Sequence, residues 1–176
     1  MSDLPVPDTG DLRSGAPLHD NLLTLLPLVG TWRGGGTGVV ASSGAEFAYG
    51  QQLSFVHDGR PFLAYESRSW LVDAHGSPIR QAWRESGFWR PGADPDDLEV
   101  MIASNTGQVL LYTGRSDGLR WEVATSLAAH APSASGVDGE RRLYALVGGE
   151  LGYATELAPE GAPYAAHLNA RLSRVA

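Results

Sequence analysis

Hydrophobic and polar residues alternate along most of the chain after Gly30, with a period of two. Period two is typical of a β-strand that buries one face, because successive side chains point to opposite sides of the strand. Turn signals that contain glycine separate the alternating runs. The runs cover residues 46–56, 62–72, 79–89, 98–102, 119–127, 151–157 and 164–175. The pattern therefore predicts an all-β chain.

The runs follow one another in series with no crossover helices between them. This order predicts nine or ten antiparallel strands joined by hairpins. A meander of that length removes its exposed edges most simply by closing into an up-and-down β-barrel, which can enclose one small ligand. A two-sheet sandwich is the alternative architecture.

The N-terminal region has a different composition. Residues 1–17 are rich in Pro, Gly, Asp and Ser and have no apolar period, which predicts a disordered leader before a barrel domain over residues 18–176. The segment His19–Leu28 is the one helical pattern, with an apolar stripe of four leucines at positions 22, 23, 25 and 26. We expect Asp20 or Asn21 to cap this short helix and Pro27 to end it.

Charge and composition exclude several classes of function. The formal net charge is −7 and the 13 basic residues are all arginine, with no basic stripe that would suit a nucleic acid. No apolar run reaches the ~18 residues that a membrane helix needs. The chain contains no cysteine, which excludes disulfides, thiolate metal ligands and thiol nucleophiles. The N-terminus lacks the pattern of a signal peptide, so we expect a cytoplasmic protein.

The five histidines are scattered and form no HxH or HExxH motif. Three of them, His57, His75 and His130, lie at turns or loops, where solvated side chains are expected. His167 differs because it lies inside the last predicted strand. Taken alone, a single histidine in a strand is more often structural than a ligand.

The glycine-rich string at residues 30–36 has the form G-x-W-x-G-x-G, with Gly30, Trp32, Gly34 and Gly36 as its motif residues. Neither a nucleophile elbow nor a phosphate-binding loop is present. The motif has a mechanical interpretation: Trp32 plugs the closed end of a small barrel, and the glycines let the first strand coil sharply.

Four segments in order resemble the nitrobindin family: GTWRGGG, HDGRPFLAYESRSW, RESGFWRP and PYAAHLNARLSR, which begin at residues 30, 57, 84 and 163. The resemblance extends from about Leu18 to the C-terminus. It implies a ten-stranded barrel, similar to lipocalins and fatty-acid-binding proteins, that holds one haem b per chain. His167 occupies the place of the family's axial histidine, and Ser42 is the nearest equivalent of a threonine that lies against the haem. The implied activity is isomerisation of peroxynitrite to nitrate at a ferric iron on His167, with nitric oxide as a further ligand.

The resemblance raises a question of strand parity. If His167 points into the barrel, strict alternation directs Leu168, Ala170 and Leu172 outward. That apolar face would then need cover, either from another subunit, as in a homodimer, or from the N-terminal leucine helix.

Two other functions remain open on the sequence. One is a non-catalytic lipocalin-like carrier of a fatty acid or another apolar molecule. The other is a haem-based sensor or carrier of nitric oxide, which would act without turnover of peroxynitrite.

Overall fold

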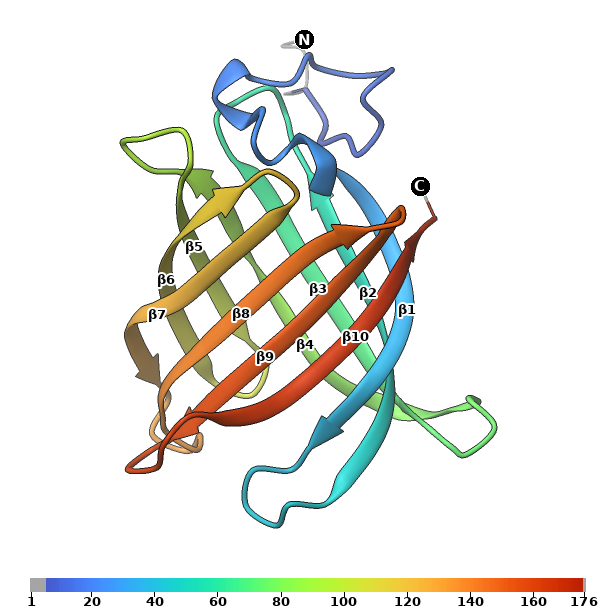
Figure 1. Ribbon diagram of the computed structural model, residues 1–176, viewed down its shortest axis with the longest axis vertical. Helices are drawn as coiled ribbons and strands as arrows, with labels where there is room; N and C mark the ends of the chain where they lie inside the picture. The colour runs from blue at the N-terminus through green and yellow to red at the C-terminus, as the bar shows by residue number, and fades with distance from the viewer. Residues whose placement is uncertain (1–5, 176) are drawn as a thin grey trace, which may run out of the picture.

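Ten antiparallel strands close into a barrel in the computed structural model, which describes residues 6–175 (Figure 1). Each strand pairs with its neighbours along the chain, and the first pairs with the last to complete the ring. The strands are β1 (Gly30–Val39), β2 (Glu46–Val56), β3 (Leu63–Val72), β4 (Pro78–Pro91), β5 (Asp97–Ser104), β6 (Gln108–Asp117), β7 (Arg120–His130), β8 (Val137–Val147), β9 (Glu150–Pro159) and β10 (Ala165–Arg174). The predicted ten-stranded barrel is confirmed, and the sandwich alternative is wrong.

Side-chain alternation places the core inside the barrel. On β2, Tyr49, Leu53 and Phe55 are buried, as period two predicts. Gln51 interrupts this apolar series and is buried as well. Its side-chain Nε2 donates a hydrogen bond to Oγ of Ser67 on β3 at 3.2 Å. The amide nitrogen of Gln51 therefore has a polar partner on the next strand, whereas its Oε1 has none among residues 6–175.

The alternation breaks in the second half of β7. Leu111 of β6 pairs with Leu127, whereas the next residue, Tyr112, pairs with Thr125. Ser126 is therefore an extra residue on β7, and such a bulge changes which face the following side chains take. Leu127 is 63% exposed as a result. The sequence prediction that the buried alternation continues to residue 127 is wrong at that position.

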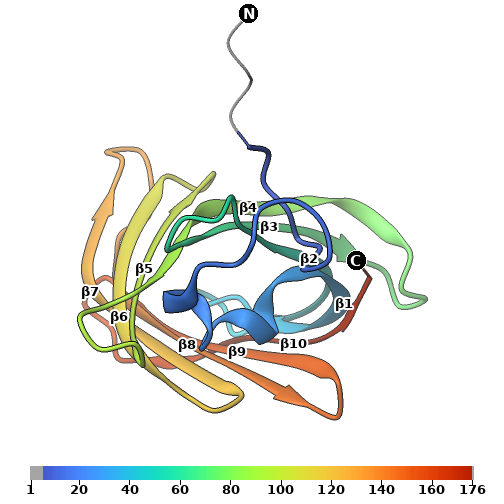
Figure 2. The same ribbon diagram turned by 90° about the horizontal axis from the view of Figure 1, so that it is seen from above.

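Two short 3₁₀ turns, η1 (Asp20–Leu22) and η2 (Leu26–Leu28), lie across one end of the barrel (Figure 2). A 3₁₀ helix has about three residues per turn, so every third side chain faces the same way. The buried leucines are accordingly at positions 22, 25 and 28, whereas those at 23 and 26 are exposed. The predicted helix is present only as these two turns, and the predicted stripe, which assumed α-helical spacing, is wrong in register.

The ends of this segment also differ from expectation. The side chain of His19, rather than Asp20 or Asn21, caps η1: its Nδ1 accepts a hydrogen bond from the backbone N–H of Asn21 at 3.1 Å. Pro27 lies within η2 instead of ending it, because proline is tolerated in a first turn. Within residues 6–175, no helical segment is long and apolar enough to cross a membrane.

Trp32 fixes these turns to the closed end of the barrel. Its side chain is buried, and the indole Nε1 donates to the carbonyl oxygen of Leu28 at 2.8 Å. The guanidinium of Arg174 lies 4.1 Å from the centroid of the Trp32 ring. Trp121, on β7, donates from its indole to the carbonyl oxygen of Thr24 at 2.9 Å. Two indole hydrogen bonds therefore anchor the segment that covers this end.

The chain ahead of η1 pairs with the β2–β3 connection. Thr9 and His57 form an isolated antiparallel bridge, with N···O distances of 2.8 and 2.9 Å between their backbones. His57 is fully buried, and neither of its ring nitrogens has a hydrogen-bond partner in the described part of the chain. The expectation of a solvated His57 is wrong, because a residue distant in sequence pairs with it. Residues 1–5 of the predicted leader lie outside the described residues.

Candidate functional site

Glycines bring β1 very close to β10, the strand that carries His167. A Cβ atom added at Gly36 would lie 1.7 Å from the carbonyl oxygen of Asn169, and one at Gly34 would lie 2.1 Å from that of Arg171. No side chain fits at such distances, so these two positions require glycine. Both glycines of the sequence motif therefore serve the contact between β1 and β10.

His167 lies at a β-bulge near the start of β10. Ala166 pairs with Glu156 of β9, whereas Leu168 pairs with the adjacent Thr155. His167 is therefore the extra residue, and it has no partner on β9. The Thr155 hydroxyl closes the ladder here by accepting from the backbone N–H of Leu168 at 3.2 Å. Because of the bulge, the direction of the half-buried His167 side chain does not follow the in–out alternation of its strand.

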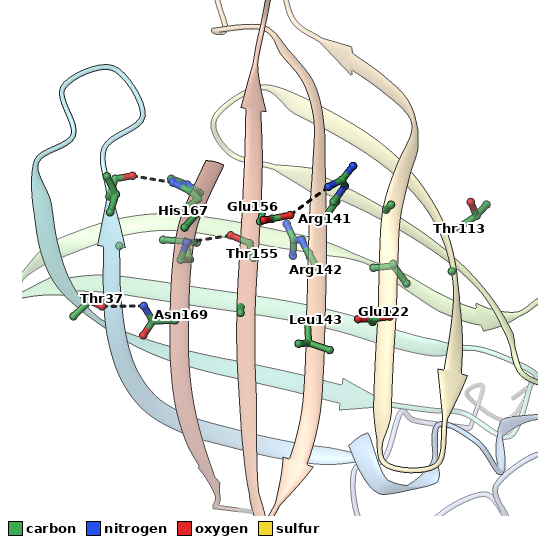
Figure 3. Close-up of a pocket in the computed structure, with 18 of the residues that line it drawn as sticks. Thr37, Thr113, Glu122, Arg141, Arg142, Leu143, Thr155, Glu156, His167 and Asn169 are labelled. Atoms are coloured by element: carbon green, nitrogen blue, oxygen red, sulfur yellow. Dashed lines mark hydrogen bonds and ion pairs between the residues drawn. The ribbon is translucent and has the colours of Figure 1, made fainter. Parts of the chain in front are cut away.

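The His167 ring is held by the last residue of β1. Its Nδ1 lies 2.9 Å from the backbone carbonyl oxygen of Val39 (Figure 3). A carbonyl oxygen only accepts, so Nδ1 carries the hydrogen and Nε2 of the neutral ring keeps its lone pair. Among residues 6–175, no group forms a hydrogen bond with Nε2. A histidine oriented through Nδ1–H by a backbone carbonyl, with Nε2 free, has the arrangement typical of metal-binding histidines.

The same bulge answers the question of strand parity. Leu168 lines a cavity inside the barrel, and Ala170 and Leu172 are buried in its core. The apolar face of β10 therefore points inward and needs no cover from a second subunit or from the N-terminal leucines. The expectation of an external leucine face is wrong, because it assumed an unbroken period of two through His167.

An interior cavity of about 500 Å³ opens at the end of the barrel opposite the 3₁₀ turns. This volume lies within the range of small-molecule sites, roughly 300–1,000 Å³. Its apolar lining consists of Trp83, Ile102, Leu110, Leu157 and Leu168. Its rim carries Val40, Ser104, Thr106, Gln108 and Ser135, and its other lining residues are Glu85, Tyr112, Glu140, Arg142 and His167.

A second hollow of about 840 Å³ lies on the outer face of the barrel and also reaches His167 (Figure 3). Many of its lining side chains are exposed, among them Arg141 and Glu156, which form an ion pair at 3.5 Å. A ligand site buries most of the surface of its ligand. The interior cavity, although smaller, is therefore the better candidate for a binding site.

Three charged side chains meet in the lining of the interior cavity. The guanidinium of Arg142 donates to both carboxylate oxygens of Glu85, at 2.9 and 2.7 Å. Its Nε donates to Oε2 of Glu140 at 2.8 Å. The hydroxyls of Tyr65 and Tyr112 donate to Glu85 and Glu140, at 2.9 and 2.5 Å. We call Glu85, Arg142 and Glu140 the buried triad.

The buried triad is electrostatically coupled. Burial acts to raise the pKa of Glu85, but the charge and hydrogen bonds of Arg142 and the hydroxyl of Tyr65 outweigh it, so the pKa lies below its ordinary value. For Arg142, burial acts to lower the pKa, and the charges of Glu140 and Glu85 raise it well above the ordinary value. Glu85 and Arg142 are therefore a charged pair inside the barrel.

The site residues predicted from the sequence lie in different parts of the barrel. His167 lines the cavity, and Gly34 and Gly36 place its strand against β1. Gly30 has a φ of 125°, which favours glycine, and begins β1 at the closed end beside Trp32. Ser42 is exposed in the turn between β1 and β2 and is not among the cavity-lining residues, whereas Val40 of the same turn is.

Sequence reasoning missed the buried triad, although a signal was present. Glu85 lies on the same face of β4 as Trp83 and Trp89. Arg142 lies on the same face of β8 as Tyr144. A charged residue in the inward series of a strand is rare unless it is paired. That pattern marks Glu85 and Arg142 as buried and paired, but it does not identify the partner.

Comparison with known families gives one match that covers most of the chain. Residues 21–174 match the family model described as "THAP4-like, heme-binding beta-barrel domain".

Curated relatives carry names that describe one activity. The chain is 42% identical to "Peroxynitrite isomerase" of Salinispora tropica, over 99% of this chain and 91% of the relative. It is 42% identical to "Peroxynitrite isomerase 1" of Mycobacterium ulcerans, over 100% of this chain and 95% of the relative. It is 44% identical to "Peroxynitrite isomerase 2" of Mycobacterium tuberculosis, over 99% of this chain and 80% of the relative.

A solved structure has the same fold. The crystal structure of Rv2717c from M. tuberculosis superposes with a TM-score of 0.78 at 31% sequence identity, covering 90% of this chain and 99% of that one.

Proposed function

The chain belongs to the nitrobindin family of THAP4-like, haem-binding β-barrels, and from this membership we propose that it is a ferric haem b protein that isomerises peroxynitrite to nitrate. The names of its relatives support the reaction. The single observation that carries the proposal is the hydrogen bond from Nδ1 of His167 to the carbonyl oxygen of Val39, which leaves Nε2 free in a residue that lines the interior cavity.

The residues of the cavity fit a haem group. His167 would be the axial ligand through Nε2, and one haem would occupy the cavity of each chain. The apolar side chains around it, Trp83, Ile102, Leu110, Leu157 and Leu168, would contact the porphyrin. Ser42 would lie near it only through the β1–β2 turn, and its contact with haem stays a prediction.

When bound, a ferric haem would supply the iron chemistry for the isomerisation of peroxynitrite and for the binding of nitric oxide. His167 would hold the group through Nε2, because the Val39 carbonyl accepts the hydrogen on Nδ1 and fixes the orientation of the ring. The apolar side chains that line the cavity would limit the access of bulk water to the haem. Peroxynitrite and nitrate contain the same atoms and carry the same charge, so the isomerisation requires no general acid or base from the chain.

A haemin titration tests the site. Purified apo-protein is titrated with haemin and followed by its Soret and visible bands, beside the variants His167→Ala and His75→Ala. We expect the wild-type protein to saturate at one haem per chain with the spectrum of a histidine-ligated ferric iron. His167→Ala should lose or shift these bands. His75→Ala should match the wild type, because His75 is exposed in the β3–β4 turn.

Stopped-flow mixing of the haem-loaded protein with peroxynitrite tests the reaction. We expect the wild type to accelerate peroxynitrite decay with nitrate as the product, and His167→Ala to do no better than free haemin. Equal, weak and non-saturating haemin spectra from the wild type and His167→Ala would refute the haem site. A loaded protein that binds nitric oxide without accelerating the decay would favour a nitric oxide sensor or carrier instead.

A further inference from the structure

The interior cavity is lined by an excess of negative charge. Arg142 is the one buried arginine among residues 6–175, and it meets the two buried carboxylates of Glu85 and Glu140. The formal charge of the buried triad is therefore −1. All three side chains are at most 10% exposed and line the cavity. A net charge in so enclosed a place is weakly screened, so it acts on whatever enters the cavity.

The arginine of the triad is not free to bind an anion. A guanidinium holds a carboxylate best through two parallel N–H···O bonds. In Arg142 that pair of bonds already goes to Glu85, from Nη1 and Nη2. Glu140 receives the Nε hydrogen and also lies 2.7 Å from Nη2. A carboxylate that reached this depth would find the arginine occupied and would meet two like charges.

The rim of the cavity has a different character. Ser104, Thr106, Gln108 and Ser135 lie there, and none of these side chains is charged. The Ser104–Thr106 hydroxyl pair, the Ser135 hydroxyl and the second amide hydrogen of Gln108 can donate hydrogen bonds to an anion. The cavity is therefore polarised, with neutral hydrogen-bonding groups at the rim and net negative charge deeper inside.

We propose that Glu85, Arg142 and Glu140 act as a charge filter that admits neutral and cationic groups to the depth of the cavity and rejects carboxylates. An amphiphilic anion then binds with its apolar part inward and its carboxylates at the rim. An amphiphilic ligand of this cavity is accordingly apolar or cationic at the end that reaches the triad and anionic only at the other end. The inference rests on the proposed ligand cavity but not on the proposed chemistry of haem.

The experiment compares ligands of equal carbon-chain length that differ only in the group at the end that enters the cavity. Apo-protein is titrated by calorimetry with 12-aminododecanoic acid, dodecanoic acid and dodecanedioic acid, whose inner ends are an ammonium, a methyl and a carboxylate. An apolar cavity without net charge would disfavour both charged ends. With the triad in place we expect the ammonium-ended chain to bind at least about tenfold more tightly than the dicarboxylate, a difference of about 1.4 kcal/mol.

Two variants assign the effect to the triad. Glu140→Gln brings the formal charge to zero and should bring the two affinities closer together. Glu156→Gln removes the same charge from an exposed glutamate on the outer face and should leave their ratio unchanged. Circular dichroism checks folding, and Glu85→Gln is the second variant should Glu140→Gln fail to fold.

Three results would overturn the filter: equal affinities of the two charged chains for the wild type, a ratio that Glu140→Gln does not alter, or no binding of any of the three chains. A haemin titration on the same preparations separates this proposal from the previous one. A protein that binds haem without discriminating between the charged chains refutes the filter alone. A protein that discriminates without binding haem refutes the haem proposal alone.

Discussion

The Nδ1 atom of His167 and the carbonyl oxygen of Val39 lie 128 positions apart in the chain and 2.9 Å apart in space. Val39 is the last residue of β1 and His167 the third residue of β10, the two strands that close the barrel. The pairing of β1 with β10, which closes the barrel, therefore also orients the ring of His167, the candidate haem ligand. A change that separates β1 from β10 should therefore also disturb the His167 ring.

Gly36→Ala should disturb the site from a distance. The added methyl would meet the carbonyl oxygen of Asn169 at 1.7 Å, so β10 must move away from β1. We expect a loss of about 1–3 kcal/mol in the free energy of unfolding, as for other overpacked sites, together with weaker haem binding. Urea denaturation and the haemin titration measure the two effects.

Gly152→Ala is the matched control for that change. A Cβ at Gly152 would have as its nearest neighbour the carbonyl oxygen of Ala145, at 3.5 Å, an ordinary contact. We expect stability and haem affinity close to those of the wild type. Equal losses in the two variants would contradict the argument, because they would reflect a general intolerance of side chains in the sheet.

Arg142→Met should be strongly destabilising and its effect should depend on pH. The variant leaves Glu85 and Glu140 buried without a cation, which typically costs about 3–5 kcal/mol at neutral pH. In the wild type, Glu85 has a lowered pKa, so its contribution to stability is present above about 4.5 and is lost as the pH falls through the folded-state value. In the variant, the unpaired carboxylates bind protons more readily when folded, so acid should narrow the gap between the two proteins.

Urea denaturation at neutral and at acidic pH measures this gap. Arg141→Met is the control, because Arg141 is the neighbouring arginine, and its ion pair with Glu156 lies on the surface. Surface pairs contribute at most about 1 kcal/mol. A gap for Arg142→Met that stayed constant with pH would argue that the lost contact is one of packing rather than of charge.

His57 should make the fold sensitive to mild acid. Burial lowers the pKa of His57 below its usual value of 6.5, and the charges of Asp58 and Asp8 oppose this only in part. The unfolded chain therefore binds the proton more readily. Stability should be full above pH 6.5 and fall as the pH drops from there through the folded-state pKa.

Thermal unfolding across this pH range tests the assignment. His57→Leu should reduce the pH dependence, since leucine carries no titratable group. His75→Leu, which changes an exposed histidine, should retain it. If both variants follow the wild-type profile, another group is responsible.

Trp32→Phe should weaken the closed end without affecting the cavity. The change removes the hydrogen bond from the indole to Leu28 and weakens the contact with Arg174. We expect a loss of about 1–3 kcal/mol in the free energy of unfolding. Haem affinity should stay at the wild-type level, because Trp32 lies at the opposite end from the cavity rim. A parallel loss of haem affinity would mean that the two ends are coupled.

The strands were predictable because their signal is local. Each run such as residues 46–56 or 151–157 carries its own alternation, and a partner strand is not needed to read it. The bulges were not predictable in the same way. Ser126 and His167 each become an extra residue only when their strand is paired in a particular register, and period two contains no mark of that register.

Local signals also failed where a distant segment covers a residue. His57 stands next to an Asp-Gly turn, which predicts exposure, yet Thr9 pairs with its backbone and the ring is buried. The partners of Arg142 illustrate the same limit. Glu140 is two positions away, but Glu85 is 57 positions away and reaches Arg142 only inside the closed barrel.

The sequence by itself determined that the chain is a β-meander with a glycine-rich first strand, and its resemblance to a known family singled out His167. Those properties are local, or depend on residue types in order, so they can be read without coordinates. Only the tertiary structure decided where His167 points, what holds its ring, and which charges share the cavity. Each of these depends on strand register and on closure of the barrel, which bring together residues whose separation along the chain carries no information about their distance in space.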